Sequence, residues 1–206
     1  MRRPSKHLDH LALTMRIAID VGFIVVIFLM VTGKLRRPTP FVQIRNIQLP
    51  YSTLTSISDL DGELAIIYFV KGRVMLQLPD TIKTQTLVAM GEKYHVAFSD
   101  TEINKFKKMD LIEVPLGTLK QFINEYDSGS FDNKLMGIRF DSPNNELGDW
   151  ITESNKVSKN TTGDKLHFYL YGDRSEQYSV VRKIFNVLQD RGVNKWSLLT
   201  WTKSRQ

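Results

Sequence analysis

The stretch FYLYGDRSEQYSVVRKIFNVLQDRGVNKWSLLT, residues 168–200, decides the fold. The aromatic and branched run over 166–171 predicts a strand, and Gly172-Asp173 ends it. Apolar side chains then recur at helical spacing (Tyr178, Val181, Ile184, Phe185 and Leu188), and Gly192 suits the left-handed position that closes a helix. KWSLLTW returns as a second strand. Strands joined through a helix pair in parallel, so the stretch predicts a β-α-β unit with its helix across the sheet.

The preceding residues predict the rest of a small α/β domain, with helices packed on a mixed β-sheet. LAIIYFVKGRVMLQLP, residues 64–79, is two apolar runs broken at Lys71-Gly72, which is typical of a β-hairpin. Ser99 and Glu102 form a capping-box pattern, which predicts a short helix. Pro115 begins another helix, whose apolar face comprises Leu116, Leu119, Phe122, Ile123 and Tyr126.

The segments around these helices are predicted from shorter patterns. Residues 35–45 are basic and contain proline, as in a connector, and FVQIRNIQLP (41–50) predicts a short edge strand that ends at Pro50. GIRF (137–140) predicts another strand, 145–157 a marginal helix, and 158–164 a solvated loop. Core packing is the first interpretation of Trp150, Trp196 and Trp201, whereas an exposed tryptophan would indicate a protein-binding face.

Composition excludes several function classes. The chain has 206 residues, a net charge of +6 with scattered Lys and Arg, and no cysteine. This argues against a dedicated nucleic-acid surface, a disulfide framework, thiol catalysis and cysteine-bound metals. The histidines lack metal-ligand spacing, and no phosphate-binding loop or paired-carboxylate signature occurs. Asp173 could be a catalytic carboxylate, but a turn or cap is favoured. We therefore predict no enzyme activity, no metal and no cofactor.

The residues before the domain contain the most apolar segment of the chain. From Ile17 to Thr32 the only ionisable residue is Asp20, and 22 residues counted from Leu11 would suffice to span a bilayer. We therefore predict a cytoplasmic tail over 1–10, a transmembrane helix over 11–34, a connector over 35–45 and a folded domain over 46–206. Four basic residues on each side of the span leave its orientation open.

Asp20 within this segment has two interpretations. A carboxylate in a membrane is by default a functional group, because desolvation raises its pKa and lets it bind and release protons. Alternatively, Arg16 pairs with it one helical turn earlier and the pair is structural. Helical spacing places a stripe of apolar residues on the face of Asp20, as a helix contact or a lipid-facing surface: Phe23, Ile24, Ile27, Phe28 and Val31.

AIDVGFIVVIFLMVTGKL (18–35), then VQIRNIQLPYS (42–52), then the closing strand-helix-strand stretch together resemble the ExbD/TolR family of proton-driven biopolymer transport proteins. The likeness covers roughly 11–78 and 114–202. Two departures are the Arg16-Ile17 pair, where the family often has Thr-Pro, and a longer 79–113 region.

The resemblance implies an energy-transducing subunit of the inner membrane, with the N-terminus cytoplasmic and the domain periplasmic. Asp20 would carry protons, and the chain would work as a homodimer with a polytopic ExbB/TolQ-like membrane subunit and a TonB- or TolA-like partner. Residues at the end of the edge strand would dock that partner or a second copy: Ile47, Leu49, Pro50 and Ser52. The alternatives are a membrane-tethered periplasmic binding or scaffold protein with a structural Asp20, or an enzyme with an unrecognised site. The sequence does not separate TonB-type from Tol-type systems.

Overall fold

The computed structural model describes residues 15–16, 19–28, 47–52, 63–126, 136–141, 143 and 145–202. The chain divides into two compact units, Met1–Phe41 and Val42–Gln206. In the first unit, residues 19–28 are helical. The second unit contains the sheet and the helices that determine the fold.

The prediction of a transmembrane helix over 11–34, and with it of a single-pass inner-membrane protein, is wrong. None of the helices in the described residues is long and apolar enough to cross a bilayer. The helical stretch 19–28 has ten residues, which at about 1.5 Å per residue rise roughly 15 Å, half of a hydrocarbon core. Of the predicted span, Met15 and Arg16 are also described, and its other residues, including Val31, lie outside the described residues.

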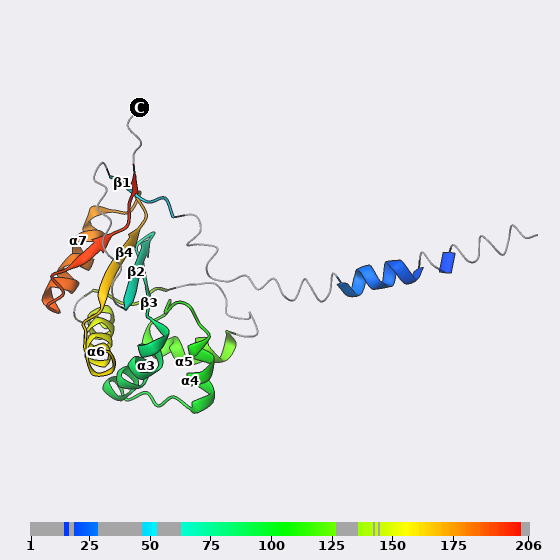
Figure 1. The fold of residues 1–206 in the computed structure, drawn as a ribbon, viewed down its shortest axis with the longest axis horizontal. Coiled ribbons are helices and arrows are strands. Elements are labelled where there is room, and N and C mark those ends of the chain that lie inside the picture. The colour runs from blue at the N-terminus through cyan, green and yellow to red at the C-terminus, as the bar shows by residue number, and fades with distance from the viewer. Residues whose placement is uncertain are drawn as a thin grey trace, which may run out of the picture. The chain divides into compact units, whose positions relative to one another are not determined.

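The second unit is an α/β domain built on a mixed four-stranded sheet (Figure 1). Its strands lie in the order β3-β2-β4-β5, and a separate two-stranded sheet joins β1 to β6. The strand bounds are β1 Tyr51–Ser52, β2 Leu64–Val70, β3 Arg73–Gln77, β4 His167–Gly172, β5 Trp196–Leu198 and β6 Trp201–Thr202. The helix bounds are α3 Asp80–Tyr94, α4 Asp100–Lys107, α5 Leu116–Glu125, α6 Glu146–Thr161 and α7 Tyr178–Asp190.

The two predicted supersecondary units are confirmed. Strands β2 and β3 form an antiparallel hairpin, with Val70 opposite Arg73. Its turn places Lys71 and Gly72 at φ 51° and 71°, the positive values that a two-residue hairpin turn requires. Strands β4 and β5 pair in parallel through α7, and β2 also pairs in parallel with β4. Gly192, just after α7, has φ 72°, as predicted.

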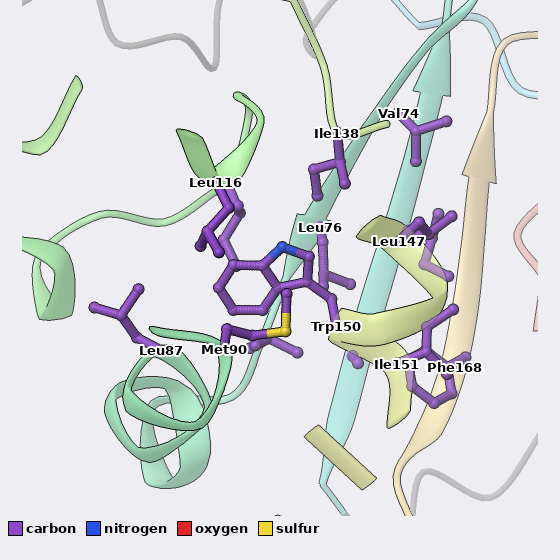
Figure 2. Close-up of a cluster of buried hydrophobic side chains, with 14 of the residues drawn as sticks. Val74, Leu76, Leu87, Met90, Leu116, Ile138, Leu147, Trp150, Ile151 and Phe168 are labelled. Carbon is purple, nitrogen blue, oxygen red and sulfur yellow. The ribbon is translucent and has the colours of Figure 1, made fainter. Parts of the chain in front are cut away.

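The sheet buries a different set of side chains on each face. Ala65, Ile67 and Phe69 of β2 join the main core under the helices, whereas Tyr68 joins a smaller cluster with Ile47, Met75 and Leu111. This is the two-residue alternation of a strand covered on both faces. Figure 2 shows Trp150 of α6 in the main core, surrounded by side chains from the sheet, from other helices and from the segment before α6: Leu76, Met90, Leu116 and Ile138.

Helices α4 and α5 begin where their local sequence predicts. Ser99 Oγ accepts from Glu102 N and Ser99 N donates to Glu102 Oε2, so the predicted capping box of α4 is confirmed. Helix α5 follows Pro115, and four of its predicted apolar residues are buried: Leu116, Leu119, Phe122 and Ile123. Helix α3 was not predicted. It packs on α4 and α6, and its buried face includes Lys83, Thr86 and Gly91.

Four local predictions are wrong. The strand predicted to end at Pro50 is not found over residues 47–50, and strand β1 begins only after Pro50. GIRF forms no strand, because Gly137 has φ 72° and turns the chain. The loop expected over 158–164 is helical up to Thr161. Tyr178 is 74% exposed instead of facing the core, since it is the first residue of α7.

Candidate functional site

The predicted docking residues belong to a segment that is attached to the domain by its buried apolar side chains. Ile47 and Leu49 are only 7% and 9% exposed, and Ile47 belongs to the smaller cluster on the sheet. Pro50 and Ser52 are half-buried, and Tyr51 between them is 62% exposed. The apolar residues Ile47 and Leu49 therefore attach the segment to its own domain and leave Tyr51 as its exposed aromatic side chain. Whether the segment docks a partner stays a prediction.

Asp173 and Arg174 hold this segment from the turn after β4. The backbone N of Gln48 donates to Asp173 Oδ2 at 3.2 Å. The backbone N of Arg174 donates to Gln48 O at 2.7 Å. The backbone N–H and the backbone carbonyl of Gln48 are thus both hydrogen-bonded to a turn that begins 125 residues later in the chain. We call these two contacts the clamp.

The carboxylate of Asp173 also builds the turn that contains it. Ser175 donates to Oδ1 from its backbone N at 2.8 Å and from its hydroxyl at 2.6 Å. The hydrogen bond from the Ser175 hydroxyl is the main reason that the pKa of Asp173 lies below its ordinary value. These contacts support the turn interpretation of Asp173, with an additional role that its sequence position did not indicate.

Gly172 fixes the position of the turn against β2. It lies opposite Phe69 in the parallel register, and a Cβ atom added to it would lie 2.0 Å from two atoms of the Phe69 ring. Since Phe69 is 2% exposed, its ring has no free space to enter.

We therefore expect Gly172→Ala to lower the free energy of unfolding by about 1–3 kcal/mol through overpacking, as measured by urea denaturation. The matched control is Gly117→Ala in α5, where an added Cβ meets nothing within 4 Å. That change should stabilise the domain by about 0.5–1 kcal/mol, because alanine favours a helix. Equal stabilities of the two variants would contradict the prediction.

The segment ends in a ribbon that presents two aromatic side chains together. Tyr51 of β1 is in parallel register with Trp201 of β6, and Trp201 N donates to Pro50 O at 2.9 Å. The two side chains are 62% and 60% exposed. Residues in register on neighbouring strands project from the same face of a sheet. The guanidinium of Arg174 lies 5.7 Å from the centre of the Tyr51 ring. We call Tyr51, Trp201 and Arg174 the aromatic platform.

Sequence reasoning missed this grouping. Trp201 was first interpreted as a core residue, and Tyr51 and Arg174 were not singled out. Only the position of Trp201 indicated this grouping, because a tryptophan just after a terminal strand can be exposed. The pairing of β1 with β6 joins the two ends of the domain, and no local pattern indicates it.

Two further carboxylates, the buried Glu146 and the part-buried Asp149, support the packing of the domain. Glu146 Oε2 accepts from Leu116 N at 3.1 Å at the start of α5, and burial raises the pKa of Glu146. Asp149 accepts from Lys93 Nζ at 2.8 Å and from Tyr94 Oη at 2.7 Å. Burial alone would raise the pKa of Asp149, but these hydrogen bonds lower it. Among the described residues, no group of three or more acidic or histidine side chains could hold a metal ion.

Most of the residues predicted to work in a membrane lie in the first unit's helical stretch. Residues 19–28 contain Asp20 and four of the five predicted contact residues, all well exposed in this structure: Phe23, Ile24, Ile27 and Phe28. The fifth, Val31, lies outside the described residues. Whether Asp20 carries protons or pairs with Arg16 stays open.

No protein-family model, curated protein or solved structure matches the chain. The resemblance to the ExbD/TolR family therefore rests on the residues that carry it, and membership in that family stays a prediction.

Proposed function

We propose that this chain is a protein-docking subunit of a proton-driven energy-coupling assembly of the ExbD/TolR type. In this proposal the domain over 47–202 binds a segment of a TonB- or TolA-like partner on the aromatic platform. The single observation that carries the docking function is the exposed register pair of Tyr51 and Trp201. The resemblance supplies the class of assembly and the identity of the partner.

The composition of the platform supports protein binding. Tryptophan, tyrosine and arginine are the residues that most often carry the binding energy of protein interfaces, because each buries a large area and keeps a polar group. Here Tyr51 and Trp201 lie on one ribbon and are more than half exposed, and Arg174, from the turn after β4, lies over the Tyr51 ring. The clamp fixes the backbone beside them, so little conformational freedom is lost on binding.

The chemistry of the platform favours an extended, acidic segment as the ligand. In the described part of the chain, β1 and β6 pair only with each other, so an added strand could bond to the ribbon's backbone. Arg174 contacts the Tyr51 ring and its charge helps lower the pKa of Asp173, but it forms no ion pair with a described carboxylate. A partner carboxylate next to an apolar residue would therefore match the guanidinium and the two rings.

A binding or scaffold protein without proton coupling is the second candidate. The observation that favours it is that the aromatic platform is built entirely from residues of the second unit and uses none of the stretch 19–28 that contains Asp20. Both candidates use the aromatic platform. They differ in whether docking responds to the proton gradient.

The docking function is tested by titrating the full chain with the purified TonB- or TolA-like protein of the same organism. Trp201 is exposed and Trp150 is fully buried, so burial of Trp201 should shift the fluorescence to shorter wavelength. By calorimetric titration, which does not need the Trp201 signal, we expect Tyr51→Ala and Trp201→Ala each to weaken binding at least tenfold, since truncating an interface hot spot costs about 2 kcal/mol or more.

Tyr178→Ala is the matched control, because Tyr178 is 74% exposed but lies on α7, outside the ribbon. Its affinity should equal that of the unmodified chain. If all three variants bound the partner with the affinity of the unmodified chain, the docking proposal would be contradicted. Crosslinking from position 51 in cells, with and without a proton-conducting uncoupler, then separates the two candidates: only a proton-driven assembly changes its crosslinking yield when the gradient collapses.

A further inference from the structure

Glu113 is a buried carboxylate without a partner among the residues that the structure describes. Its side chain is only 1% exposed, and neither of its carboxylate oxygens has a hydrogen-bond partner. An ionised carboxylate in such a place is costly, because it loses its hydration and gains nothing in return. Neither the docking surface nor the clamp uses this residue.

Glu113 lies where two segments meet to cover the outer edge of β3. Leu76 and Ile112 exchange hydrogen bonds of 3.1 and 2.8 Å, which attach the first segment to β3. Ile138 N donates to Val74 O at 2.7 Å and attaches the second segment. Gly137 N donates to the backbone O of Glu113 at 2.8 Å and joins the two segments to each other. We call this arrangement, residues 111–114 and 136–138 against β3, the edge cover.

The backbone of the edge cover fits β3 closely. Gly137 has φ 72°, and a Cβ atom added to it would lie 3.0 Å from Val74 N and 3.1 Å from Val74 O. The cover therefore occupies the edge at which β3 would otherwise offer backbone donors and acceptors to another strand.

The charged side chains around the edge cover are engaged elsewhere or form no bond with Glu113. Asp141 pairs with Lys183 at 2.9 Å, and Glu146 of α6 accepts from Leu116 N. The charge of Asp110 raises the pKa of Tyr68, and that of Arg139 lowers the pKa of Glu146. Arg73 of β3 forms no ion pair with Glu113, whose oxygens are both unpartnered. Burial is accordingly the only cause that raises the pKa of Glu113, to about 7.

We propose that Glu113 is a proton-controlled latch of the edge cover: when protonated it keeps the cover closed on β3, and when ionised it favours opening. The opened state would hydrate the carboxylate and free the edge of β3 at Val74 and Leu76. This inference does not depend on the proposed docking function.

The direction of the pH effect follows from the two states. An exposed glutamate titrates near 4.5, whereas the closed cover holds its proton up to about pH 7. Between these values opening releases a proton, so the closed state loses stability as pH rises. Above pH 7 both states are ionised and the loss is complete. Since opening releases one proton between pH 4.5 and about pH 7, the equilibrium constant for opening rises tenfold for each pH unit in that interval. Between pH 4 and pH 8 it should therefore rise roughly 300-fold.

Hydrogen exchange of the full chain at pH 4–8 tests the latch. The readout is the protection factor, corrected for the intrinsic pH dependence of exchange, of the four amides that hold the cover: Leu76, Ile112, Gly137 and Ile138. In the unmodified chain we expect their protection to fall by up to roughly 300-fold as pH rises. Glu113→Gln should abolish this dependence, whereas the exposed Glu92→Gln should retain it.

Two outcomes would overturn the proposal. One is the same pH dependence at the four amides in Glu113→Gln and in the unmodified chain. The other is an equal loss of protection at all core amides, which would indicate global unfolding. Carbon-13 NMR titration of the Glu113 carboxyl group in the unmodified chain keeps the test valid if the variant does not fold: a midpoint near 4.5 would reject the latch, and a midpoint near 7 would support it.

Discussion

Replacing Trp150 with alanine is expected to lower the free energy of unfolding by about 3–5 kcal/mol, the cost of removing a fully buried large aromatic side chain. The side chain has no exposed surface, and it joins α6 to side chains from β3, α3 and α5 (Figure 2). The loss should appear as a lower midpoint of urea denaturation. Trp201→Ala is the control: its ring is 60% exposed, so its stability should stay within about 0.5 kcal/mol.

A second substitution at the same position separates volume from polarity. The indole N of Trp150 is buried without a hydrogen-bond acceptor, and such a donor costs about 1–3 kcal/mol. Trp150→Phe removes this donor while keeping one aromatic ring. We therefore expect it to cost much less than alanine, under about 1.5 kcal/mol. If the alanine variant lost less than 1 kcal/mol, Trp150 would not be the centre of the core.

The parts of the fold that sequence reasoning predicted correctly depend on neighbouring residues. The turn at Lys71-Gly72 lies between two apolar runs, and the capping box of α4 needs only Ser99 and Glu102. The parallel strands around α7 follow from apolar spacing over 166–200. In each case the physical cause lies within one element or between consecutive elements, and it is therefore visible in the sequence.

The parts that were missed depend on distant partners. Helix α3 buries Lys83, whose ammonium donates to Lys107 O at 3.3 Å, so its buried face lacks a continuous apolar stripe. The predicted strand before Pro50 is instead an irregular segment over 47–50, because the backbone of Gln48 bonds to the turn at 173–174. Tyr51 meets Trp201 only through the pairing of β1 with β6. Local patterns identify such residues as apolar or polar but do not join them.

Replacing Asp173 with alanine is expected to loosen the attachment of the segment 47–52 to the domain. The variant loses the acceptor of Gln48 N and both hydrogen bonds from Ser175. A buried hydrogen bond to a charged group contributes about 1.5–3 kcal/mol to stability. Asp173 is half-exposed, so each of its hydrogen bonds contributes less than this. We therefore expect the three bonds together to account for a loss of about 2 kcal/mol in the free energy of unfolding. Urea denaturation measures it. Asp190→Ala, an exposed acid at the end of α7, should change stability by less than 0.5 kcal/mol.

The pH dependence gives the same prediction a second readout. Because the folded domain lowers the pKa of Asp173 below its ordinary value of 3.8, the stability that this group contributes is present above that value and is lost as pH falls through the folded pKa. The difference between the unmodified chain and Asp173→Ala should therefore be largest near neutral pH and shrink in acid. Asp173→Asn, which keeps an oxygen acceptor without the charge, should retain part of the stability at neutral pH.

The clamp also links this substitution to function. If Asp173 holds Gln48, its removal should let Tyr51 move away from Trp201, although neither ring is altered. Binding of the partner should then weaken about tenfold, because ordering a freed segment costs about 1–2 kcal/mol for each backbone residue that is fixed again. A variant that loses stability but keeps full affinity would show that the clamp serves the fold alone. Loss of affinity with an unchanged tryptophan spectrum in the free chain would indicate instead that Asp173 contacts the partner directly.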